Sequence, residues 1–273
     1  MLFKKKTCIN CQSEYDVVEP TCPVCGTRDD RFEQLKIPQH MVWLPIYKQL
    51  GLFLLGIVVL NLISFILGLA LANTYEETDP TFVLIVNLVR YLSVLAMMGV
   101  LLIKSYPKFK DCFCHFLPYV VGFSCGFLLI GLNIAYSNIV SLFYTTTTNQ
   151  NQSLANSLVL NYPITSLFLL SLIGPTVEEL TYRVGLFTFL SRTKKWIAYL
   201  VTIIFFAIIH FNFFATGDDI INELINLPVY AMAGAALCVL YDFFGLPASL
   251  LAHYVNNFLS ILPLFITAIV QKL

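Results

Sequence analysis

A few ionisable side chains interrupt the long apolar stretches of this chain. Within those stretches lie Arg90, Glu178, Glu179, Arg183, His210 and His253, with Asp242 and His115 nearer the expected ends. An ionisable group inside a membrane costs several kcal/mol unless it faces the protein interior or water. Each of these residues is therefore a candidate for a functional role.

The segment PTVEELTYR places two glutamates and an arginine in one apolar run. On a helix, Glu179 and Arg183 are four residues apart and share a face, with the acid first, which favours an ion pair. Glu178 then points about 100° away, so its carboxylate stays free. A free carboxylate in apolar surroundings suits a general base that works near neutral pH. The alternative is a buried salt-bridge cluster that only joins helices.

Two further segments supply imidazole and amide groups. His210 follows Phe206 by four residues, and His253 precedes Asn257 by four, so each pair shares a helix face. Such residues also serve as polar contacts between packed helices. One carboxylate, two imidazoles and an amide on three separate spans are, however, the groups needed to activate a water and stabilise an oxyanion.

The eight cysteines form two groups. Cys8, Cys11, Cys22 and Cys25 form two CxxC pairs, whereas Cys112, Cys114, Cys125 and Cys238 are scattered and are interpreted as small apolar residues. Two CxxC pairs match a tetrahedral zinc site, and two disulfides are the alternative. Zinc is favoured because neighbouring lysines and arginines should keep this segment in the reducing cytoplasm.

Composition indicates lipid as the solvent for most of the chain. Of 273 residues, 58% are apolar and only 12% are charged, against roughly 25% charged residues in an ordinary soluble domain. Formal net charge is zero and no long basic block is present, which excludes nucleic acid as a partner. The N-terminus lacks the apolar core of a cleavable signal peptide.

The predicted fold is an all-α bundle of seven to eight transmembrane helices, preceded by a small zinc ribbon. Residues 1–30 form the ribbon, which needs its metal to fold, residues 31–45 a linker, and residues 46–273 the membrane domain. Apolar stretches of crossing length predict spans near 46–72, 82–103, 116–143, 162–190, 196–214, 227–244 and 246–271. Pro263 breaks the last stretch and leaves open a short eighth helix.

Positive charges predict the orientation. Lys104, Lys108 and Lys110 mark one cytoplasmic loop, and residues 192–195 mark another. The loops at 73–80, 144–161 and 216–226 hold no lysine or arginine and should lie outside. The low-complexity run in the second of these predicts a flexible loop. This pattern places the N-terminus in the cytoplasm, in what we expect is a bacterial plasma membrane.

Three motifs occur in order, each on its own predicted span: EELTYR fits EExxxR, FAIIH fits FxxxH and HYVNN fits HxxxN. Over residues 116–265 the chain thus resembles the CAAX protease and bacteriocin-processing family, the type II CAAX prenyl endopeptidases. The resemblance implies an intramembrane protease with its site in a cavity among helices.

The resemblance also implies roles for particular residues. Glu178 would activate a water with His210, while Glu179 and Arg183 would support the site. His253 and Asn257 would stabilise the oxyanion, and Phe206 would line the cavity. A catalytic divalent ion on Glu178, His210 and His253 stays an open alternative to a directly positioned water. No HExxH motif is present.

The expected function is hydrolysis of a peptide bond within the membrane, on a CAAX-type substrate, a leader peptide or a small membrane protein. Expected partners are membrane lipid, the peptide substrate and a regulatory partner of the zinc ribbon. One alternative is a catalytically silent scaffold or bacteriocin-immunity factor. Another is a small-solute transporter, against which stands the absence of an internal repeat.

Overall fold

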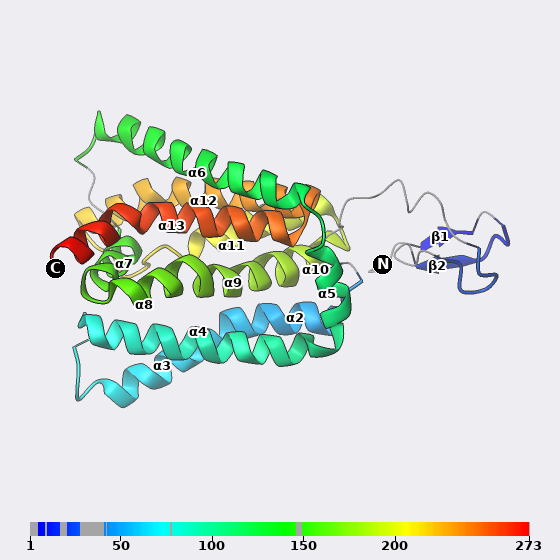
Figure 1. Cartoon of the computed structure of the whole chain (residues 1–273), viewed down its shortest axis with the longest axis horizontal. Helices are drawn as coiled ribbons and strands as arrows, with labels where there is room; N and C mark the ends of the chain where they lie inside the picture. Colours follow the sequence, from blue (N-terminus) through cyan, green and yellow to red (C-terminus); the bar gives the residue numbers. More distant parts are fainter. Residues whose placement is uncertain are drawn as a thin grey trace.

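A computed structural model of the chain describes residues 5–8, 10–16, 21–27, 41, 43–76, 78–145 and 149–272. Most of these residues are helical, and the helices pack side by side in one bundle (Figure 1). The predicted linker at 31–45 lies mostly outside the described residues. The predicted all-α fold with a cysteine-rich N-terminal module is confirmed.

The N-terminal module is a two-stranded hairpin with two matching turns. Strands β1 (Lys5–Thr7) and β2 (Glu14–Asp16) pair antiparallel, with Lys6 opposite Tyr15. The N–H of Gln12 donates to Cys8 O at 3.1 Å, and the N–H of Gly26 donates to Cys22 O at 2.9 Å. Gln12 and Gly26 both have positive φ, which closes each turn tightly around its cysteine pair.

The membrane domain consists of helices joined by short turns. Their bounds are α2 Ile46–Leu54, α3 Leu60–Leu71, α4 Pro80–Leu102, α5 Tyr106–Cys112, α6 Leu117–Ser141, α7 Gln150–Asn161, α8 Pro163–Phe168, α9 Gly174–Glu179, α10 Thr188–Ser191, α11 Lys195–Ile208, α12 Asp218–Phe244 and α13 Leu246–Val270. A 3₁₀ turn, Ile103–Ser105, joins α4 to α5. π-helical segments at Leu55–Val59, Leu169–Ile173 and Leu180–Phe187 join α2 to α3, α8 to α9 and α9 to α10.

In the described part of the chain, six helices are long and apolar enough to cross a membrane. They are Ile46–Leu71, Pro80–Cys112, Leu117–Ser141, Pro163–Ser191, Asp218–Phe244 and Leu246–Val270. The remaining predicted span, 196–214, overlaps the shorter apolar helix Lys195–Ile208. The eighth helix does not form separately within the described residues, because α13 runs through Pro263 to Val270 without interruption.

Two segments predicted as loops are partly helical. Residues 150–161 form α7, which begins where the Asn149 side chain accepts from the N–H of Gln152. Residues 218–226 are the first turns of α12, predicted to begin only at 227. The buried carboxylate of Glu223 accepts from the N–H groups of Gln150 and Asn212, at 3.0 and 3.1 Å, and so ties these segments together. Polar composition misled the prediction because both segments pack on protein.

One broken helix runs through the middle of the domain between α13 and α4 (Figure 1). It extends from Pro163 to Ser191 and holds the short α-helix α9 between two π-helical segments. Wide π turns inside helices often occur at functional sites. Gly56 allows the α2–α3 helix to approach this helix at Thr181, where any Cβ would collide with the threonine side chain. The backbone beside the glutamates is thus held by close packing.

Candidate active site

A fully buried charged network lies at the centre of the broken helix. Arg183 Nη1 is 3.1 Å from Glu179 Oε1, and neither side chain is exposed. The same Glu179 oxygen accepts from His253 Nδ1 at 2.9 Å. The predicted pair is therefore present, and it links the broken helix to α13. Because the Glu179 side chain is fully buried beside these two partners, it does not reach a substrate in the cavity.

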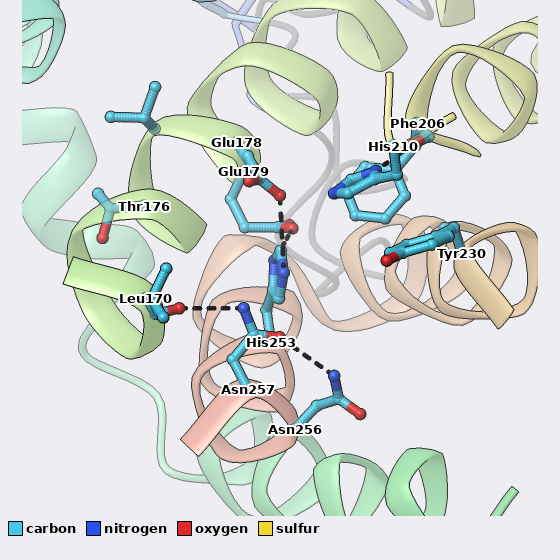
Figure 2. A network of polar contacts seen from close by, with 12 residues as sticks. Leu170, Thr176, Glu178, Glu179, Phe206, His210, Tyr230, His253, Asn256 and Asn257 are labelled. Carbon is cyan, nitrogen blue, oxygen red and sulfur yellow. Dashed lines mark hydrogen bonds and ion pairs between the residues drawn. The ribbon is translucent and has the colours of Figure 1, made fainter. Parts of the chain in front are cut away.

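Glu178 has the opposite environment. Its side chain is 18% exposed, and its Oε2 lies 3.7 Å from His253 Nε2 (Figure 2). This separation is longer than a hydrogen bond. A water on the cavity side can contact both atoms. The His253 ring therefore lies beside both glutamates: Glu179, whose charge is balanced by Arg183, and Glu178, whose carboxylate is partly exposed.

The sequence predicted His210 inside a span at 196–214. In the structure α11 ends at Ile208, and His210 lies just beyond its end. Its Nδ1 is 2.7 Å from Phe206 O, and because a carbonyl only accepts, Nδ1 carries the proton. The His210 side chain thus donates to the Phe206 carbonyl, which in a continuing α-helix would accept from a backbone N–H of the next turn. Nε2 of the neutral ring remains as an acceptor. The ring stacks on Tyr230 of α12, with centroids 4.3 Å apart and planes at 12° (Figure 2).

Asn257 lies one turn beyond His253 on α13, as predicted. Its Nδ2 donates to Leu170 O at 3.1 Å, across to the π turn of the broken helix (Figure 2). Its Oδ1 accepts from the amide of Asn256 at 3.1 Å. Among the described residues, the second N–H of the Asn257 amide has no acceptor, and this donor is available to a developing oxyanion.

These side chains line a single cavity of about 400 Å³. The residues of the three motifs that face it are Glu178, Phe206, His210, His253 and Asn257. Glu179 and Arg183 are absent from its wall and support it from behind. Phe206 lies between these parts, since Arg183 stacks on its ring at 4.5 Å and His253 meets it edge-on at 5.9 Å.

Sequence reasoning missed three kinds of residue in the cavity wall. Tyr230 holds His210, and its hydroxyl contacts the amides of Asn149 and Asn151, both at 3.2 Å. No spacing in the sequence connects these residues. Asn256 had a visible signal, since it adjoins Asn257 and lies three residues after His253. Arg90 was noted as an ionisable residue, but nothing in the sequence placed it beside the motif residues.

The four N-terminal cysteines form a separate site. Their Sγ atoms all lie within 4.8 Å of one another, and the Cys8–Cys25 and Cys11–Cys22 pairs are 3.6 Å apart. Four thiolates at 2.3 Å around a tetrahedral ion would be about 3.8 Å apart, so the arrangement fits a metal. The Ser13 hydroxyl lowers the pKa of the Cys22 thiol to about 6, which favours the thiolate that a metal requires.

In the described part of the chain, no other group of three or more histidine, cysteine or acidic side chains gathers its ligand atoms so closely. The cavity residues Glu178, His210 and His253 are thus spaced around a volume rather than converged on one point. Their arrangement suits a water held between carboxylate and imidazole.

Comparison with known proteins supports the same class. Residues 159–259 match the family described as type II CAAX prenyl endopeptidase Rce1-like. All three motifs fall within this range, and the resemblance predicted from them is confirmed. The match covers the part of the chain that holds the cavity residues and leaves the N-terminal cysteine module outside.

The chain is also similar to the UPF0177 protein YvdC of Lactococcus lactis subsp. lactis (strain IL1403). The two are 32% identical over 104 residues, which cover 38% of this chain and 39% of that protein. No solved structure matches the chain.

Proposed function

We propose that this protein is an intramembrane endopeptidase in which Glu178 activates the attacking water. One observation carries the proposal: of two adjacent glutamates, Glu179 is neutralised by Arg183 and His253, whereas Glu178 faces the cavity with its carboxylate open. An open carboxylate beside imidazole within a multi-pass membrane protein has the position of a general base.

In the proposed reaction, a water lies against Glu178 Oε2 and His253 Nε2 and attacks the carbonyl carbon of the scissile peptide bond. Glu178 accepts one proton from that water as the C–O bond forms. The carbonyl oxygen becomes an oxyanion, which the free N–H of Asn257 stabilises. Glu178 then gives its proton to the leaving amine as the C–N bond breaks, which regenerates the carboxylate. His210 Nε2 faces the same cavity and is a further acceptor. Because a water has two hydrogens, one goes to Glu178 and the other to the Nε2 of one histidine, His253 or His210.

The two histidines have a shared constraint. Each uses its Nδ1 hydrogen on a fixed acceptor, Phe206 O or Glu179 Oε1, so in the neutral state each presents only an acceptor at Nε2. His253 can donate to the oxyanion only after it gains a proton. Asn257 therefore carries the oxyanion role in the neutral site, with His253 as its proposed assistant.

The proposed substrates are a CAAX-type peptide, a leader peptide or a small membrane protein, which enters the cavity from the lipid. The N-terminal module is proposed to hold one zinc ion, by its four cysteine thiolates, and to dock a regulatory partner. Its position outside the family match supports a role separate from the chemistry.

Membranes from cells with the natural protein and with Glu178→Gln provide the direct test. Gln keeps the shape but removes the proton acceptor, and loss of a general base costs about 10² to 10⁴ in rate. Quantitative proteomics should find peptides that accumulate uncleaved only with the variant, and purified protein should cleave those peptides. Thermal unfolding in detergent should be unchanged. Cleavage by Glu178→Gln at the natural rate would rule out the proposed base.

The N-terminus is proposed to be cytoplasmic in a bacterial plasma membrane. Figure 1 shows the turns from α3 to α4 and from α6 to α7 at one end of the bundle, with α5 and α10 at the other. Lysines gather at the α5 end, which supports this orientation. In cysteine-free protein in intact cells, an impermeant thiol reagent should label Gln150→Cys and spare Lys108→Cys. The reverse pattern would mean the opposite orientation.

A further inference from the structure

Arg90 is a second charged residue in the cavity wall, and no motif includes it. It lies ten residues after the first and twelve before the last residue of α4, which runs from Pro80 to Leu102. At 1.5 Å per residue, it is roughly 15 to 18 Å from either end of that helix. The guanidinium therefore lies deep in the membrane, in the same cavity as Glu178.

The partners of Arg90 are all neutral. Its Nη2 donates to Asn87 Oδ1 at 2.6 Å, and its Nη1 donates weakly to Ser64 Oγ at 3.4 Å. The guanidinium also lies 4.8 Å from the ring centre of Tyr91. Within the described residues, Arg90 forms no ion pair, and its buried Nε has no acceptor.

Arg90 and Arg183 differ in how their charges are balanced. Both arginines lie at membrane depth, but Arg183 has Glu179 at 3.1 Å, whereas Arg90 has no carboxylate within ion-pair distance among the described residues. Glu178 faces the same cavity and is not close enough to neutralise it. A membrane-buried cation without an anion is costly. It becomes favourable when the cavity receives an anionic ligand.

We propose that Arg90 binds a carboxylate of the peptide substrate, so that the cavity recognises an acidic group on one side and hydrolyses the peptide bond at Glu178. This rests on the proposed function, in that a peptide occupies the cavity. A guanidinium suits the site because its planar fork can donate two parallel hydrogen bonds to one carboxylate. Asn87 holds that fork in place through its side-chain oxygen.

The depth of Arg90 favours a peptide carboxylate over a lipid phosphate. Lipid phosphates lie at the interfaces, about 15 Å from the middle of a hydrocarbon core about 30 Å thick. A lipid would have to draw its headgroup to the membrane centre to reach this residue. A peptide that already lies in the cavity brings its carboxylate there without that movement.

The test measures binding, so that it does not depend on hydrolysis. The probes are two N-dansylated apolar hexapeptides of one sequence, one ending in a free carboxylate and the other in a carboxamide. They are titrated by fluorescence into detergent-solubilised full-length protein that carries Glu178→Gln. The acid should bind about 10- to 100-fold more tightly, since hydrogen bonds to charged groups contribute about 1.5–3 kcal/mol. Adding Arg90→Gln should bring the ratio of affinities close to one.

Two controls sharpen the result. Lys104→Gln removes a positive charge from an exposed site at the end of α4, outside the cavity, and should leave the ratio unchanged. An amidated peptide with one internal Glu in place of Gln separates a side-chain carboxylate from the terminal one. Arg90→Lys keeps the charge but not the fork, so the ratio should fall part of the way, and this variant serves if Arg90→Gln does not fold.

The proposal is overturned if protein with Arg90 intact binds the free-acid and carboxamide peptides equally and also shows no preference for the peptide with an internal Glu. It is also overturned by a preference that persists in Arg90→Gln or is undiminished in Arg90→Lys. Displacement of both peptides by phosphatidylglycerol, only when Arg90 is present and without any preference for the acid, would assign the residue to lipid instead. None of these outcomes bears on the role of Glu178, which the cleavage test decides separately.

Discussion

The N-terminal cysteine cluster and the membrane cavity are both polar sites, but they are built in different ways. In the cluster, four ligands come from two matching turns within residues 8–25, and each turn is closed by its own backbone. In the cavity, the glutamates, His210 and His253 come from separate elements, and contacts between residues far apart in sequence position them, such as Glu179 with His253 and His210 with Tyr230. The first site depends on local spacing, and the second depends on the fold of the bundle.

Removal of metal should give the largest difference in response between the N-terminal module and the membrane bundle. Structural zinc contributes about 10–16 kcal/mol of apparent binding energy in small zinc modules, which are unfolded without it. A chelator, or Cys22→Ser, should therefore unfold the N-terminal module and leave the bundle and its intrinsic peptide cleavage intact. The readouts are zinc per chain by mass spectrometry, proteolysis of residues 1–30 and cleavage in detergent.

Cys114→Ser is the matched control, because this exposed cysteine lies between α5 and α6, away from the cluster. It should retain one zinc ion per chain. Absence of zinc from reduced, natural protein would contradict the assignment of the metal. Loss of cleavage together with zinc would contradict the independence of the two regions.

A smaller effect is expected when the buried pair behind the cavity is broken. Glu179→Ala leaves Arg183 as an unpaired buried charge, which should cost about 3–5 kcal/mol of stability. Replacing both Glu179 and Arg183 by apolar residues of similar size should restore much of that stability without restoring full activity, since His253 loses its acceptor. Thermal unfolding and cleavage on one preparation measure both. A Glu179→Ala protein as stable as Glu178→Gln would refute this division of roles.

How much of each site could be predicted from the sequence depends on whether local spacing or the packing of the bundle positions its residues. The CxxC pairs predicted the cysteine cluster, because its four thiols lie on local turns. Glu179 and Arg183 were predictable as a pair because four-residue spacing on a helix fixes their shared face. The contact of Glu179 with His253 was not predictable, because it depends on how α13 crosses the broken helix. That crossing is set by packing, which local spacing does not encode.

The errors have a physical cause as well. Hydropathy treats a polar segment as a loop in water, yet α7 and the start of α12 satisfy their polar groups on protein, through Asn149 and Glu223. The predicted span at 196–214 was too long because His210 takes the Phe206 carbonyl with its side chain and ends the regular helix. Both features depend on tertiary contacts.

The smallest expected effect concerns Tyr230, which connects α7 to the catalytic side of the cavity. Its ring stacks on His210 and its hydroxyl contacts Asn149 and Asn151. Aromatic pairs contribute about 0.5–1.5 kcal/mol, so Tyr230→Leu should slow cleavage by about 2- to 10-fold. Tyr230→Phe keeps the stack and should lose less. If the hydroxyl contacts alone position His210, Tyr230→Phe will cleave as slowly as Tyr230→Leu. In the proposed mechanism His210 contacts the water and not the peptide, so the loss should appear in kcat and not in KM. A change confined to KM would place Tyr230 in substrate binding instead.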